Sequence, residues 1–121
     1  MSDVAVQTCL AGGHVVVALA GEIDVATAGA VTEAFAEAAS REGPGGCLCG
    51  DLSGVTFLDS TGLTALVTAR RACEERGIEM VLVGAAGSVR RVLALSRVDS
   101  LFRQFPSLEE FQAAVGGSEE D

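Results

Sequence analysis

A cluster of polar residues interrupts an otherwise apolar sequence at residues 51–63, which read DLSGVTFLDSTGL. The short apolar run that leads into it, Cys47–Leu52, is typical of a buried strand. A Ser-Gly turn signal predicts that Ser53–Asp59 forms a loop. After the cluster, apolar residues recur with the spacing of one helix face until Gly77, a helix terminator. The stretch therefore predicts a strand, a polar loop and a helix in succession.

The tetrapeptide Asp59-Ser60-Thr61-Gly62 has the composition of a helix start. The side chain of Asp59 or of Ser60 can cap the helix, and Gly62 permits another backbone to approach closely. The free N–H groups of the first turn and the helix dipole together tolerate an anion, such as a phosphate on Ser60. A well-capped helix start with no further role explains the same four residues equally well.

The rest of the chain alternates strand and helix patterns. Val4–Leu10 and His14–Ala20 are β candidates around the turn Ala11-Gly12-Gly13, which predicts an opening hairpin. The other predicted elements are a helix over Val25–Arg41 capped by Asp24, a strand over Ile78–Val83, a helix after Ser88, a short strand over Leu101–Phe105 and a last helix after Ser107.

Buried strands that alternate with crossover helices form parallel sheets. We therefore expect a single α/β domain over residues 1–115, with a mixed, mostly parallel sheet, an N-terminal antiparallel hairpin and about four covering helices. The tail Gly116–Asp121 is acidic and has no apolar anchor, so we expect it to be disordered.

Charge and composition exclude several classes of function. The 121 residues include 17 acidic and 8 basic side chains, and every basic one is arginine. A chain without lysine cannot form a Schiff base or a P-loop, and a net charge of −9 disfavours nucleic acid as a partner. The apolar run Val15–Ala20 is far shorter than the roughly 20 residues of a transmembrane helix. No cation precedes Arg41, so we expect a cytoplasmic protein with no membrane partner.

The sequence also lacks the residue combinations that common enzymes and metal sites require. The sole histidine, His14, opens a strand, where we expect an exposed turn or strand-edge residue that does not activate Ser60. A receiver domain could use Asp51 as its phosphate acceptor, but it needs an acidic pair and a late lysine that this chain does not supply. We expect no enzyme activity, no cofactor and no metal, and free thiols at the four cysteines, Cys9, Cys47, Cys49 and Cys73.

Several short motifs follow one another along the chain. They are GEID at residues 21–24 followed by Thr27-Ala28, DLSGV at 51–55, FLDSTGL at 57–63, SVRRVL at 88–93, Leu101-Phe102 and PSLEE at 106–110. With this order and spacing, the chain resembles a stand-alone STAS domain of the anti-sigma-factor antagonist family.

The resemblance implies a switch that works by exchange of partners. An unphosphorylated antagonist of this family binds an anti-sigma factor, itself a serine kinase with a histidine-kinase-like ATPase fold, and so releases a sigma factor. The kinase phosphorylates the serine that corresponds to Ser60 here, and a metal-dependent serine phosphatase removes the phosphate. Asp59, Thr61 and Gly62 would flank the phosphoacceptor, and Asp24 would lie in the docking surface.

The chain departs from the family pattern in three respects. Gly50 stands where a bulky aliphatic residue is usual, Arg97-Val98 replaces a usual Gly-Leu, and the four cysteines exceed what the family needs. The cysteines leave room for redox control. An alternative function is therefore a STAS module that is not phosphorylated and binds a small ligand or a protein partner, tuned by its cysteines.

Overall fold

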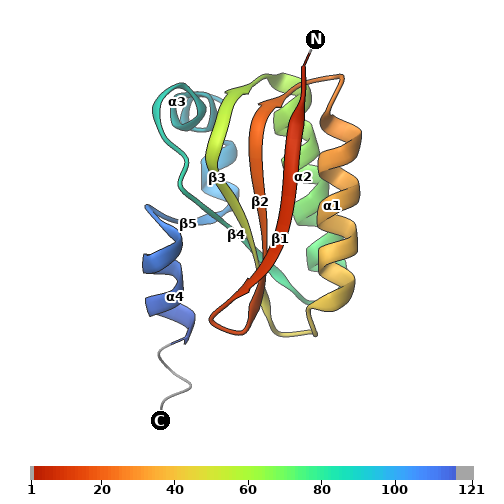
Figure 1. Cartoon of the computed structure of the whole chain (residues 1–121), viewed down its shortest axis with the longest axis vertical. Helices are drawn as coiled ribbons and strands as arrows, with labels where there is room; N and C mark the ends of the chain where they lie inside the picture. The colour runs from red at the N-terminus through yellow and green to blue at the C-terminus, as the bar shows by residue number, and fades with distance from the viewer. Residues whose placement is uncertain (1, 117–121) are drawn as a thin grey trace.

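The computed structural model describes residues 2–116, and this part of the chain folds into one sheet with helices on both faces (Figure 1). The strands are β1 (Val4–Ala11), β2 (His14–Ile23), β3 (Cys47–Leu58), β4 (Glu79–Val83) and β5 (Arg103–Phe105). The helices are α1 (Ala28–Arg41), α2 (Ser60–Glu75), α3 (Gly87–Leu95), α4 (Leu108–Gly116) and a short 3₁₀ helix, η1 (Val98–Leu101). Within residues 2–116, no helix is long and apolar enough to cross a membrane.

The strands lie in the order β1-β2-β3-β4-β5, with β1 antiparallel to β2 and each later pair parallel. Ala11 and His14 close the predicted hairpin. Between them Gly12 and Gly13 have φ angles of 60° and 83°, the two positive values that a type I′ turn requires. The structure confirms the predicted α/β fold, with a mixed and mostly parallel sheet that begins in an antiparallel hairpin.

The helices divide unequally between the two faces of the sheet. Helices α1, α2 and α3 pack on one face and form the larger core, in which Phe35, Leu66 and Leu93 are fully buried. Helix α4 packs on the other face, where Phe111 contacts a smaller cluster that includes Val16. The central strands are thus covered on both sides, which explains why their sequences are continuously apolar.

Gly50 on β3 makes room for an aromatic ring from α1. A Cβ atom at Gly50 would lie 3.0 Å from Cζ of Phe35 and 3.1 Å from Cδ2 of Leu82. Both neighbours are fully buried, so the ring occupies the space that an aliphatic side chain on the strand would take. Gly50 therefore leaves to the ring of Phe35 the space that a larger residue on β3 would need.

The loop predicted over Ser53–Asp59 is wrong, because β3 continues to Leu58. Strand β2 runs beside it as far as Ile23, so the extra residues of β3 have a partner for their backbone groups. The Ser-Gly signal marks an irregularity in this pairing: a Cβ atom on Gly54 would lie 2.9 Å from that of Ala20. The glycine here permits two strands to approach and does not turn the chain.

The exit from α3 also differs from the prediction. Arg97 has φ 65° and ψ 11°, a left-handed conformation that glycine adopts more readily than arginine. Residues 98–101 then form η1, and β5 begins at Arg103 instead of Leu101. Gly116, predicted to begin a disordered tail, is the last residue of α4, and the rest of that tail lies outside the described residues.

We predict that Gly50→Val lowers the free energy of unfolding by about 1–3 kcal/mol, because the added methyl groups collide with two buried side chains. Urea unfolding measures the loss. Phe35→Leu in the same background should restore part of it, and a double-mutant cycle gives the coupling. Full stability of the single Gly50→Val variant would show that the ring of Phe35 does not fill this space.

Candidate functional site

Asp59 holds the first turn of α2. Its backbone is extended, and its Oδ1 accepts a hydrogen bond from the N–H of Gly62 at 3.0 Å. Its carbonyl oxygen accepts a second one from the N–H of Leu63 at 2.9 Å. Of the two predicted cap candidates, Asp59 is the cap, and Ser60 is the first residue of the helix.

The side chain of Ser60 is exposed at that first helical position. The carbonyl oxygen of Ser60 accepts a hydrogen bond from Oγ1 of Thr64 at 3.0 Å. Within residues 2–116, the Ser60 hydroxyl itself takes part in no hydrogen bond. Because Asp59 supplies the cap, the hydroxyl can change chemically without removing a bond that holds the helix.

Gly62 places the start of α2 directly against the end of β2. A Cβ atom on Gly62 would lie 2.6 Å from the carbonyl oxygen of Ile23 and 2.6 Å from Cδ1 of Leu58. The N–H of Asp59 donates to the same Ile23 carbonyl at 3.4 Å. The close approach predicted for Gly62 is confirmed, and half-buried Thr61 lies between it and Ser60.

Asp24 opens the loop between β2 and α1 and is tied into it by hydrogen bonds. Its Oδ1 accepts from the N–H of Ala26 at 3.0 Å, and its own N–H donates to Oγ1 of Thr27 at 3.0 Å. The hydroxyl of Ser2 donates to Oδ2. These bonds, that from Ser2 above all, hold the pKa of the Asp24 carboxyl below its ordinary value.

The predicted helix cap at Asp24 is wrong. Helix α1 begins at Ala28, three residues later than predicted, with Thr27 as its N-cap residue. The carbonyl oxygen of Asp24 accepts from the N–H groups of Thr27 and Ala28 at 3.1 and 2.8 Å, which closes a turn before the helix. Local bonds of an aspartate to its own loop compete with helix formation, and here they delay it.

Two exposed apolar side chains accompany these polar residues. Val25 in the loop is 79% exposed, and Phe57 near the end of β3 is 46% exposed. Phe57 pairs with Glu22 on β2, so both residues lie at the strand ends that lead to Asp24 and Ser60. The sequence prediction did not find them, because it assigned Phe57 to a loop. An aromatic residue directed to solvent from a strand is the signal that would have marked a binding surface.

We call these residues together the Ser60 surface: Asp24, Val25, Phe57, Asp59 and Ser60. The surface combines two carboxylates, a hydroxyl and two exposed apolar groups at one end of the sheet. This composition suits the docking of another protein better than the enclosure of a small molecule.

His14 lies elsewhere, at the hairpin end of β2, and is half-buried, not an exposed edge residue as predicted. Its Nδ1 lies 2.9 Å from Oε2 of Glu42, whose Oε1 accepts the N–H of Val15 at 2.9 Å. The pair therefore ties the end of α1 to the start of β2. Within residues 2–116, no group of three or more histidine, cysteine or acidic side chains could hold a metal ion.

The cysteines are free thiols in different surroundings. Burial raises the pKa of Cys49 to about 12 and that of Cys73 to about 11. Desolvation also raises the pKa of Cys47, which is partly buried, whereas Cys9 is exposed on β1. Since the thiolate is the reactive form of cysteine, Cys49 and Cys73 are poorly placed for redox chemistry at neutral pH.

Comparison with known proteins shows the family of the chain. The family model of the STAS domain matches residues 5–111. The chain belongs to the STAS domain family. A similar protein is the anti-sigma-F factor antagonist RsfB of Mycobacterium tuberculosis, 38% identical in an alignment of 112 residues that covers 90% of this chain and 87% of RsfB.

Two further relatives carry similar names. The anti-sigma-B factor antagonist of Listeria monocytogenes is 34% identical over 88 residues, which are 73% of this STAS domain chain and 75% of that protein. The crystal structure of an anti-sigma factor antagonist from Mycobacterium paratuberculosis superposes with a TM-score of 0.76 at 32% identity, covering 93% of this chain and 94% of that one. All three relatives are named as anti-sigma factor antagonists, and the one of known structure shares the fold of this chain.

We predict that Asp59→Ala lowers the free energy of unfolding of this STAS domain by about 1 kcal/mol, because the N–H of Gly62 loses its acceptor. Asp59→Asn should remain within about 0.5 kcal/mol of the original protein, since asparagine caps helices as well as aspartate. Urea unfolding monitored by circular dichroism compares the two variants. An equal loss in both would assign the effect to the charge of Asp59 and not to its cap.

Proposed function

We propose that this STAS domain is an anti-sigma factor antagonist switched by phosphorylation of Ser60. Unphosphorylated, it binds an anti-sigma factor and so releases a sigma factor. The anti-sigma factor is a serine kinase with a histidine-kinase-like ATPase fold, and a metal-dependent serine phosphatase reverses its action. The names of the relatives from Mycobacterium tuberculosis and Listeria monocytogenes support the antagonist role. The chain acts as target and binding partner, without catalysis of its own.

The position of Ser60 carries this proposal. Its hydroxyl is exposed at the first residue of a long helix and takes part in no hydrogen bond within the described chain. Asp59 caps the helix in its place. A kinase can therefore reach the hydroxyl without unfolding the helix.

Phosphorylation is a transfer from ATP to the Ser60 oxygen. Oγ attacks the γ-phosphorus, the bond from that phosphorus to the departing ADP oxygen breaks, and a base on the kinase takes the hydroxyl proton. Hydrolysis by the phosphatase returns serine and inorganic phosphate. Asp59 is already engaged with Gly62, so this proposal gives it a capping role and assigns the base to the kinase.

The fold should tolerate the phosphate. The group adds roughly −1.5 to −2 charges at the positive end of the dipole of α2, where anions are favoured. The first four N–H groups of a helix lack intrahelical partners. Here the N–H of Asp59 donates to the Ile23 carbonyl and that of Gly62 to the Asp59 side chain, so within the described residues those of Ser60 and Thr61 are left without acceptors. Phosphate oxygens at Ser60 have donors nearby for this reason.

A bound partner should not tolerate it. On the Ser60 surface, the new charge lies next to Asp59, and Asp24 adds a second carboxylate at the same end of the sheet. Docking through Val25 and Phe57 removes water from the same area, and burial of an unpaired doubly charged group costs free energy. A loss of about 3 kcal/mol weakens binding roughly a hundredfold, which is enough to release the partner.

We predict that incubation with ATP and the cognate anti-sigma factor kinase adds one phosphate to the chain. We expect intact mass and peptide mass spectrometry to locate it on Ser60, because that hydroxyl is exposed and makes no hydrogen bond to residues 2–116. Ser60→Ala should take up no phosphate while it unfolds at an unchanged urea midpoint. Thr61→Ala is the matched control and should still be phosphorylated. Incorporation into Ser60→Ala would contradict the assignment.

We predict that Ser60→Glu remains folded but binds the kinase at least tenfold more weakly than the original chain, as measured by calorimetry with purified partner. Glutamate carries less charge than phosphate, so the loss is smaller than that of full phosphorylation. Ser40→Glu adds the same charge near the far end of α1, away from the Ser60 surface, and should bind normally (Figure 1). Equal affinities of Ser60→Glu and the original chain would refute exclusion by charge.

A further inference from the structure

The two edges of the sheet are protected very differently. Strand β5 is three residues long, and its Arg103 pairs with Glu79 at 2.8 Å while its guanidinium lies 5.4 Å from the ring centre of Phe105. Strand β1 is eight residues long, reads VAVQTCLA and carries no charged side chain. Long, uncharged edge strands attract a further strand, and charged or short ones resist it. β1 is therefore the edge at which the sheet can grow.

The hairpin determines which backbone groups of β1 are open. Ala11 and His14 close a two-residue turn, and the N–H of Glu22 donates to the carbonyl oxygen of Asp3 at 2.9 Å. Because hydrogen-bonded pairs alternate along an antiparallel ladder, the odd-numbered residues from Asp3 to Ala11 bond to β2. The N–H and C=O groups of the even-numbered residues point away from the sheet, and these residues are Val4, Val6, Thr8 and Leu10.

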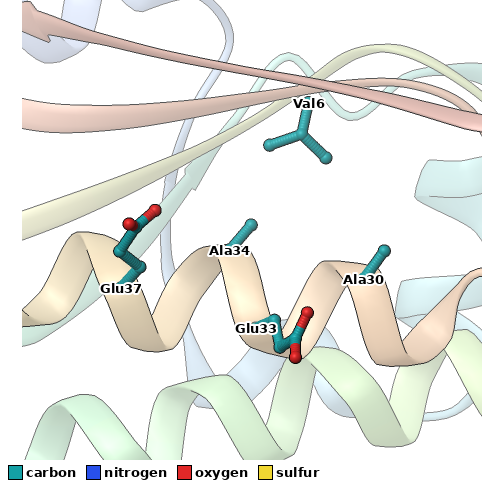
Figure 2. A pocket seen from close by; sticks show the side chains of 5 residues that line it. All are labelled: Val6, Ala30, Glu33, Ala34 and Glu37. Carbon is teal, nitrogen blue, oxygen red and sulfur yellow. The ribbon is translucent and has the colours of Figure 1, made fainter.

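One even-numbered side chain of β1, Val6, faces a groove beside α1. Val6 is 40% exposed and lies over Ala30 and Ala34 of α1 in a groove of about 430 Å³, whose other lining residues are Glu33 and Glu37 (Figure 2). Figure 2 shows Val6 directed from the strand toward the helix, with the small alanine side chains directed back toward it. The groove has room for an apolar side chain from a neighbouring strand.

We propose that this edge binds a second copy of the chain, through antiparallel pairing of β1 with β1 around a two-fold axis at Thr8. An antiparallel edge is its own complement, so one surface serves both copies. In this register Thr8 faces Thr8 of the second copy, and Val6 faces Leu10 of the second copy. Three hydrogen-bonded residue pairs then form about six backbone hydrogen bonds.

Side chains favour this register. Leu10 is 72% exposed in the single chain, and pairing directs it into the groove beside Val6 of the other copy. Charges agree as well. Arg41 lies beside Thr8 and Leu10 and pairs with Glu37 of its own helix at 3.7 Å, whereas Glu33 lines the groove beside Val6 and has no ion pair within the described residues. The two-fold axis therefore brings Arg41 of the second copy toward Glu33.

Sedimentation equilibrium of the full chain across micromolar to millimolar concentration tests the proposal. We expect a reversible dimer, and Val6→Lys should weaken it at least tenfold, because the longer side chain fills the groove that Leu10 of the second copy enters and because a lysine on an edge strand resists pairing. Gln112→Lys, which places the same charge on the exposed side of α4, is the matched control and should dimerise normally. A monomer at every concentration, or a dimer unaffected by Val6→Lys, would overturn the proposal.

A second variant separates dimerisation from folding. The N–H of Thr8 points away from β2, so Thr8→Pro removes an edge donor and leaves the hairpin hydrogen bonds in place. We expect Thr8→Pro to weaken the dimer at least tenfold while its far-ultraviolet circular dichroism stays unchanged. A folded Thr8→Pro variant that dimerises normally would place the interface elsewhere.

Cross-linking to the natural thiol of Cys9 tests the register. Gln7 faces Cys9 of the second copy in a non-hydrogen-bonded pair, where side chains are closest. Gln7→Cys with oxidised glutathione, which accepts the two electrons and two protons, should therefore give a covalent dimer. The original chain and Ala5→Cys should not. A covalent dimer from Ala5→Cys but none from Gln7→Cys would contradict an axis at Thr8.

Discussion

The contact between the backbone of Gly62 and the end of β2 sets the arrangement of this end of the molecule. Any side chain larger than hydrogen would meet the Ile23 carbonyl oxygen and the Leu58 side chain. The first turn of α2 is consequently fixed against the sheet, with the Asp59 cap on one side and Ser60 toward solvent. The loop after β2 begins directly after Ile23, the residue that carries this carbonyl group. A helix start, two strand ends and a loop therefore meet at a single glycine.

Features governed by neighbours in sequence could be predicted from the sequence. The Gly12-Gly13 hairpin, the start of α2 at Asp59-Ser60 and its end before Gly77 depend on local backbone preferences, and the structure has all of them. The parallel order of the later strands also follows from alternating patterns, since crossover helices leave few other topologies. At these places the local backbone preferences and the strand and helix patterns predict the same structure.

Features that depend on residues distant in sequence could not be predicted in this way. Ser-Gly at residues 53–54 reads as a turn by itself, but the continuation of β2 beside it makes it part of a strand. Asp24 reads as a helix cap until its bonds to the loop and to Ser2 are seen. Gly50 is unusual for a strand until the ring of Phe35 is placed over it. In each case the local sequence is compatible with two structures, and the tertiary contacts determine which of them forms.

The same distinction applies to the candidate site. The polar residues at the start of α2 were recognisable as a group, because they follow one another in the chain. Val25 and Phe57 were not, since their exposure is known only once the strand ends are placed. These two side chains contribute little to either core, so substitutions there are nearly free of folding constraint. After gene duplication, copies of such a domain could diverge at these two exposed positions while the scaffold and the serine at the start of α2 are inherited unchanged.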